Sequence, residues 1–187
     1  MPFSVVVPDV VMDESWHFSK RHKLGHRGDG SDGNVEQQLV GVIGQNMVNL
    51  GLCQPLMQND TGFDGGIDFQ VFGINFDVKT MGRTRYPEQH YVNNLLRSQI
   101  NYHCHAYLFL SFNKSNRELT FCGWLPKEMF LYRATLYRQG TERERSDGTT
   151  FELKADTFEI QNKDLYNDFT SWPELIAQWY RHSEDLL

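Results

Sequence analysis

The sequence predicts a mixed α/β fold, in which a central mixed β-sheet is flanked by helices. The chain has 187 residues, of which 40% are hydrophobic and 13% aromatic, enough to bury the core of one domain. Apolar residues recur at helical spacing after residue 34, and several apolar runs of strand length lie between turn-rich segments. Helices and strands therefore alternate along the chain, which favours a sheet with helices on its faces.

The first predicted helix follows a Gly- and Asp-rich loop at residues 25–33. It begins near Asn34, with Asp32 or Asn34 as its cap, and ends at Gly51. One face of this helix carries an acid followed by three apolar residues: Glu36, Val40, Ile43 and Met47. Their spacing predicts that Glu36 lies on the face that packs against the sheet.

The remaining elements are predicted from alternation, apolar runs and turn residues. In order they are a short strand at 52–57, a loop at 59–66, a hairpin of strands 67–72 and 76–80 around the turn 73–75, a loop at 81–87, a helix over 88–101, a buried strand at 104–112, a turn at 113–116, a partner strand at 118–125, a helix at 127–137, a polar loop to 150, a strand at 157–160 and an amphipathic helix at 172–182.

These elements predict a single domain with three parts. Residues 34–125 form the core, with the order α-β-β-β-α-β. Residues 1–33 are an N-terminal arm and loop, and residues 126–187 are a C-terminal extension packed on the core.

The distribution of charge leaves room for a nucleic-acid partner, although the formal net charge is −6. Residues 147–187 hold nine acids and three bases, so this segment alone carries −6. Residues 1–146 hold 15 acids and 15 bases, and the bases gather near residues 20–27, 79–97 and 133–145. Phosphate contacts need local basic clusters rather than a high overall pI.

The three cysteines follow no disulfide framework, which predicts reduced thiols and a cytoplasmic location. The apolar run at residues 3–12 lacks a preceding basic segment, so no signal peptide is expected. No apolar stretch is long enough to predict a membrane span.

The predicted hairpin carries the residues that indicate chemistry. Asp77 and Lys79 are two residues apart on its second strand, so they project from the same face. A tight turn brings Asp68, on the first strand, alongside them. Charged groups on an apolar hairpin are costly to bury without a compensating partner. A divalent cation between the carboxylates would provide it, and two carboxylates with waters and a substrate phosphate suit Mg²⁺.

This pattern resembles the PD-(D/E)XK nuclease superfamily, which includes many restriction endonucleases and Holliday-junction resolvases. Asp68 matches its first acid, and Asp77-Val78-Lys79 matches its triplet. The resemblance implies a restriction-endonuclease-like core over about half the chain. It also implies Asp68, Asp77 and the Val78 carbonyl as metal ligands, and Lys79 as the group that orients the attacking water. The metal that this resemblance implies is Mg²⁺, with Mn²⁺ expected to substitute for it.

Four further positions are assigned beyond this motif. Glu36 matches a helix acid that completes the metal site in many members of the superfamily, and Gln99 matches a glutamine that follows the triplet in some. Arg83 and Arg85 follow the triplet on the predicted loop and are expected to contact substrate phosphates.

Alternatives stay open at several of these positions. Ile67 stands where the superfamily often has proline, so Asp64 rivals Asp68 as the first acid. Glu36 is also explained as a helix-start acid, and the hairpin charges as a surface salt-bridge cluster. A zinc site around His103, Cys104 and His105 has no standard spacing.

The predicted function is hydrolysis of phosphodiester bonds, most simply in DNA, in a repair, recombination or phage setting. RNA is a weaker alternative substrate. A rival from another class is a catalytically idle subunit with the same fold that binds nucleic acid or acts in assembly. A homodimer and the choice between endonuclease and exonuclease action stay open.

Overall fold

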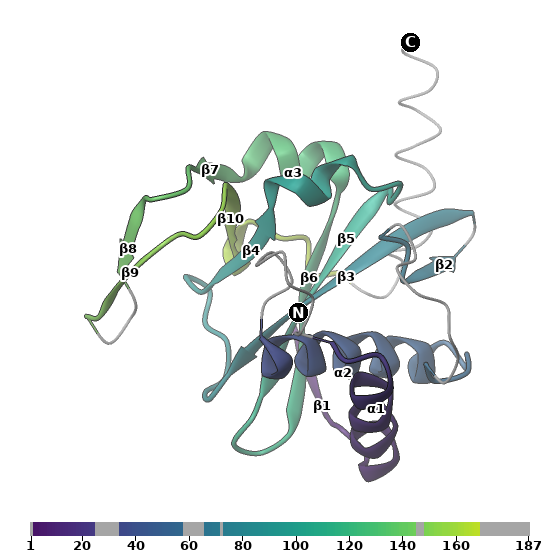
Figure 1. Ribbon diagram of the computed structural model, residues 1–187. Coiled ribbons are helices and arrows are strands. Elements are labelled where there is room, and N and C mark those ends of the chain that lie inside the picture. Colours follow the sequence, from purple (N-terminus) through teal and green to yellow (C-terminus); the bar gives the residue numbers. More distant parts are fainter. Residues whose placement is uncertain (1, 25–33, 58–65, 72, 145–147, 169–187) are drawn as a thin grey trace.

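A computed structural model describes residues 2–24, 34–57, 66–71, 73–144 and 148–168 (Figure 1). Its centre is a curled mixed sheet of five strands in the order β1-β6-β5-β3-β2. The strands are β1 (Phe3–Val6), β2 (Phe69–Val71), β3 (Ile74–Arg83), β5 (Ala106–Asn113) and β6 (Glu118–Pro126). β3 and β5 run parallel, and the other neighbouring pairs run antiparallel. The fold is therefore mixed α/β, as predicted.

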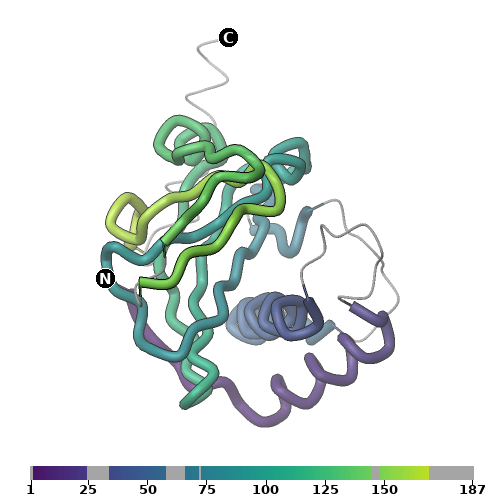
Figure 2. Tube along the Cα trace, turned by 60° about the vertical axis from the view of Figure 1, so that its left-hand side comes forward, coloured from purple at the N-terminus to yellow at the C-terminus, as the bar shows by residue number. Residues whose placement is uncertain are grey.

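Two helices, α1 (Asp9–Arg21) and α2 (Val35–Gly51), cover one face of this sheet (Figure 2). α2 begins where predicted, because Asn34 and Gln37 form a capping box in which each side chain accepts a hydrogen bond from the other's backbone N–H at 2.9 Å. Its apolar face packs against alternate residues of β3 and β5 in one continuous core.

The opposite face of the sheet is covered by a second layer, drawn in teal, green and yellow in Figure 2. This layer contains α3 (Lys127–Arg133), the short helical turn η1 (Arg97–Asn101) and a sheet of order β4-β10-β7. Its strands are β4 (Val92–Leu96), β7 (Thr135–Tyr137) and β10 (Thr157–Gln161). A second apolar cluster, including Tyr107, Phe109, Leu125 and Phe130, lies between the two sheets. The remaining described elements are the hairpin β8 (Glu142–Glu144) and β9 (Thr150–Glu152), and the turn η2 (Asn162–Asp164).

The structure corrects three expectations about elements. The helix predicted over 88–101 is absent, and that segment forms β4 and η1, because β4 pairs along its length with β10. The strand predicted at 52–57 is also absent; there the Met57 N–H donates to the Asn46 side chain at 2.7 Å instead of to a strand. The helix predicted over 127–137 ends at Arg133, and β7 follows it.

The N-terminal arm contributes to the sheet, since β1 pairs with β6. The other predicted strands are present with changed lengths: β2 is shorter than predicted, and β3 is longer and extends into the predicted loop at 81–87. The strand β8 forms within the predicted polar loop before residue 150. The predicted loop 25–33 and the predicted helix 172–182 lie outside the described residues. None of the described helices is long and apolar enough to span a membrane.

Candidate active site

Asp77 and Lys79 form an ion pair on β3, in which the aspartate is buried and the lysine is half-buried. The Lys79 ammonium nitrogen lies 2.8 Å from Asp77 Oδ1. Asp77 is 2% exposed, whereas the Lys79 side chain is 18% exposed. Their neighbours Phe76 and Val78 point into the core under α2, so the charged pair projects from the other face of the strand, as alternation predicts.

Asp68 is held against β3 on both sides of Asp77. Its backbone N–H donates to the Phe76 carbonyl at 2.8 Å, and its carboxylate Oδ2 accepts from the Val78 N–H at 2.5 Å. The Asp68 carboxylate therefore accepts the hydrogen bond that a paired strand would accept at this edge of β3, just before β2 begins. This arrangement brings the two predicted acids together and fixes the position of Asp68.

These residues line a cleft of about 720 Å³. Its walls come from the end of α1, one face of α2, the open edge of β3, and the β4–η1 segment. The lining residues include five predicted site residues: Asp68, Asp77, Val78, Lys79 and Gln99. Gln99 reaches the cleft from η1 rather than from the helix that was predicted there.

The donor set at this cleft fits a hard divalent cation. In a strand, the N–H and C=O of one residue point to the same side. Because the Val78 N–H points to Asp68, the Val78 carbonyl also faces the open edge of β3. Two carboxylates and one backbone carbonyl are oxygen donors of the kind that Mg²⁺ binds while keeping several waters.

Glu36 does not lie at this site, so its predicted place in the metal site is wrong. Its side chain is 63% exposed, and its Oε1 lies 2.7 Å from the Lys114 ammonium nitrogen. The reason is the direction of α2, which runs antiparallel to β3. Near its start, Val40 approaches Gly82 at the far end of the strand, so the first turn of α2 lies away from Asp77.

The α2 residue that does reach the acids is Gln45, which sequence reasoning missed. Its Nε2 lies 3.4 Å from the Asp68 carbonyl oxygen. Gln45 is nine residues after Glu36, or about 13 Å further along a helix that rises 1.5 Å per residue. Its only signal in the sequence is a polar side chain that follows the largely apolar run at residues 39–44 of the helix.

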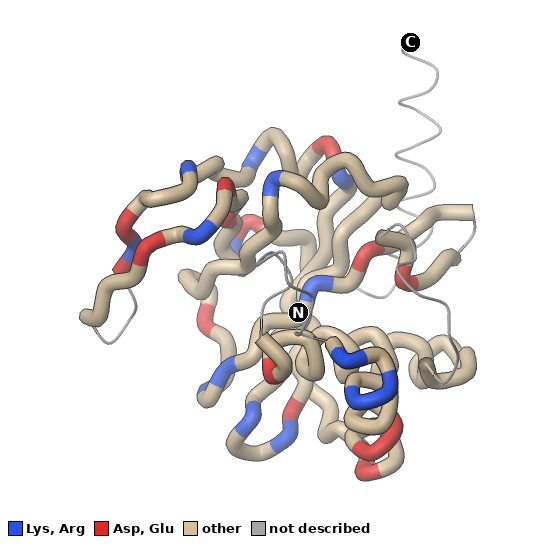
Figure 3. Tube along the Cα trace, viewed as in Figure 1, with Lys and Arg blue, Asp and Glu red and all other residues tan. Residues whose placement is uncertain are grey.

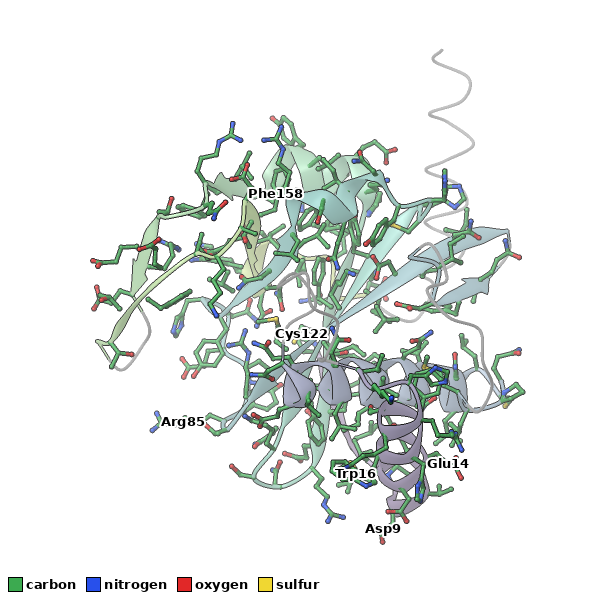
Figure 4. The ribbon with its side chains drawn as sticks, viewed as in Figure 1. Asp9, Glu14, Trp16, Arg85, Cys122 and Phe158 are labelled. Atoms are coloured by element: carbon green, nitrogen blue, oxygen red, sulfur yellow. The ribbon has the colours of Figure 1, made fainter. Side chains whose placement is uncertain are left out.

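Arg83 and Arg85 also lie outside the cleft, which corrects their predicted role. Arg83 is still part of β3, and it donates to the Val92 carbonyl at 2.6 Å while stacking 4.7 Å from the centre of the Tyr91 ring. Burial lowers the pKa of Arg83 from its ordinary value. Arg85 is exposed beyond the end of β3, far from β2 (Figure 4). The Arg83 side chain therefore links the end of β3 to the start of β4 through a hydrogen bond.

Asp77 lies close to the buried thiol of Cys104. Burial raises the pKa of the nearby Cys104 thiol to about 11, and the charge of Asp77 contributes to this rise. His105 does not point to a zinc site, because its Nδ1 accepts from the Asn75 N–H at 2.9 Å. Among the described residues, no three His, Cys, Asp or Glu side chains gather as a metal-binding group.

Asp64, the rival first acid, lies outside the described residues. Asp68 therefore stands as the described partner of Asp77. No protein-family model matches the chain, and neither the curated proteins nor the solved structures contain a match.

Proposed function

We propose that this chain is a divalent-metal-dependent nuclease with a restriction-endonuclease-like core, which hydrolyses phosphodiester bonds in DNA. The observation that carries the proposal is the set of two carboxylates held beside a lysine on one cleft. A buried ion pair is in itself weak support for stability, and replacing it with apolar residues often costs nothing. Its place on a cleft beside a second carboxylate therefore favours a chemical role.

The residues divide the chemistry among them. Asp68, Asp77 and the Val78 carbonyl would hold the ion, and Mg²⁺ supplies Lewis acidity toward the scissile phosphate when bound. Lys79 donates hydrogen bonds from a position next to Asp77. An ammonium group there orients an attacking water and stabilises the negative charge that develops on the phosphate.

Substitutions at the ion pair test this proposal. Asp77→Asn should abolish Mn²⁺ binding in calorimetry and cleavage of plasmid and oligonucleotide substrates. Lys79→Ala should retain Mn²⁺ binding but lose about 100-fold or more in rate, the size typical of removing one group that stabilises developing charge. Glu144→Gln, on exposed β8, removes a carboxylate away from the cleft and serves as the control.

The outcomes separate the two classes of function. Wild-type Mn²⁺ affinity in Asp77→Asn, with an intact thermal transition, would overturn the metal assignment. Binding of nucleic acid without cleavage in Mg²⁺ or Mn²⁺ would favour the catalytically idle binding or assembly subunit.

A further inference from the structure

Side-chain amides are the most numerous kind of polar group among the described residues that line the cleft. These five amides are all half-buried: Gln38, Gln45 and Asn49 from α2, Asn94 from β4 and Gln99 from η1. α2 lies on one side of the central sheet and β4 on the other, so the amides face the cleft from two layers (Figure 2). Each amide offers a donor and an acceptor, which matches the edges of nucleobases rather than phosphates.

Positive charge is scarce inside the same cleft. Lys79 is the one lysine or arginine among the described lining residues, and it is paired with Asp77. Binding to duplex DNA depends on cations that track the phosphate backbone. The cleft interior has no such track, so its contacts are suited to the uncharged parts of a nucleotide.

The cleft volume of about 720 Å³ lies in the range of about 300–1,000 Å³ that is usual for clefts binding small organic groups.

We infer that this cleft binds unpaired nucleotides, so that the enzyme acts on single-stranded DNA or on frayed and flapped ends. The inference rests on the proposed function and specifies its substrate. The Watson–Crick edges that the amides would contact are exposed only when a base is unpaired. Asp68 and Asp77 line the same cleft as the amides, so a nucleotide bound by the amides would lie near both acids.

The test compares an eight-nucleotide single strand with a blunt hairpin duplex, by fluorescence anisotropy in Ca²⁺ and by cleavage in Mg²⁺. The wild-type protein should bind the single strand about tenfold or more tightly than the duplex, and should cut it faster. The double variant Gln38→Leu/Asn49→Leu should weaken single-strand binding about tenfold with Mn²⁺ affinity unchanged. Gln89→Leu, at an exposed glutamine outside the cleft, should have no effect.

The outcomes distinguish this inference from the proposed function. If the duplex is bound and cut as well as the single strand or better, the inference is overturned but the proposed nuclease activity stands. Single-strand affinity that is unchanged in the double variant would have the same consequence. Selective binding of the single strand without cleavage would support the inference and overturn the nuclease. Because the comparison of the two substrates uses the wild-type protein, it holds even if the double variant fails to fold.

Discussion

At the scale of single residues, the site depends on which polar side chains lie next to Asp68 and Asp77. The parity of β3 predicted that Asp77 and Lys79 share a face, and their 2.8 Å contact agrees. Parity is a local property of a strand, so the sequence alone reveals it. Which residue of α2 lies beside the acids depends on the position of α2 along β3. Packing between the two elements sets that position, so the local sequence does not reveal it.

Gln45→Glu should therefore strengthen metal binding. Gln45 lies beside the Asp68 carbonyl, so a glutamate there adds a third carboxylate near the acids. Without metal the added repulsion should lower the melting temperature, whereas in Mn²⁺ the variant should be stabilised more than the wild type. We expect about a tenfold gain in Mn²⁺ affinity by calorimetry, because ligand charge raises affinity for hard cations. Unchanged affinity would mean that the ion does not lie near Gln45.

Glu36→Gln should leave metal binding and cleavage unchanged. Glu36 pairs with Lys114 at the exposed start of α2, and such exposed pairs contribute about 0.2–1 kcal/mol. A loss of no more than this amount in urea unfolding is expected. A large loss of Mn²⁺ affinity would show that Glu36 reaches the ion after all.

At the scale of elements, the site depends on the close approach of α2 to β3. A Cβ atom built on Gly44 would lie 1.8 Å from Thr80 Oγ1 and 2.9 Å from Thr80 Cβ. Glycine at this position lets the helix approach the strand, which in turn brings Gln45 to Asp68. The amide face of α2 and the acids of β3 are thereby held across one cleft.

Gly44→Ala should destabilise the protein by about 1–3 kcal/mol, the usual cost of overpacking. It should also weaken Mn²⁺ binding, because α2 and β3 must separate at the site. Gly44→Ala/Thr80→Ala removes the nearest atom and should recover part of both losses. Gly41→Ala is the matched control, since a Cβ there meets nothing within 4 Å. Equal effects at the two glycines would contradict this account.

The failed prediction of a helix over 88–101 belongs to the same scale. Tyr91 and Leu95 recur at a helical interval, and the local pattern does not separate the two structures. The strand β4 forms because β10, about 60 residues later, pairs with it from Val92↔Gln161 to Leu96↔Thr157. Local periodicity cannot reveal a pairing partner so distant in the sequence. Asn94, in the middle of β4, then lines the cleft.

At the scale of the whole molecule, charge is distributed unevenly along the chain. Residues 147–187 carry the entire formal charge of −6. Bases gather at the end of α1 (Figure 3), where Lys20, Arg21 and Lys23 surround His22, which lines the cleft. The sequence alone reveals this basic cluster. The fold adds that the cluster lies beside the cleft, whereas Arg83 and Arg85 lie outside it.

Lys20→Ala/Lys23→Ala should therefore weaken binding of a single strand and flatten its salt dependence. Both side chains are exposed, and Lys20 lies 4.6 Å over the Trp16 ring. Each lost phosphate contact should reduce the slope of log K against log salt by about 0.7 on single strands, so the double variant should lose up to about 1.4. Mn²⁺ affinity should not change, because neither lysine is a ligand. Arg85→Ala removes an equally exposed base beyond the far end of β3 and should keep the wild-type slope. If Arg85→Ala flattened the slope instead, the strand would cross the end of β3 rather than the end of α1.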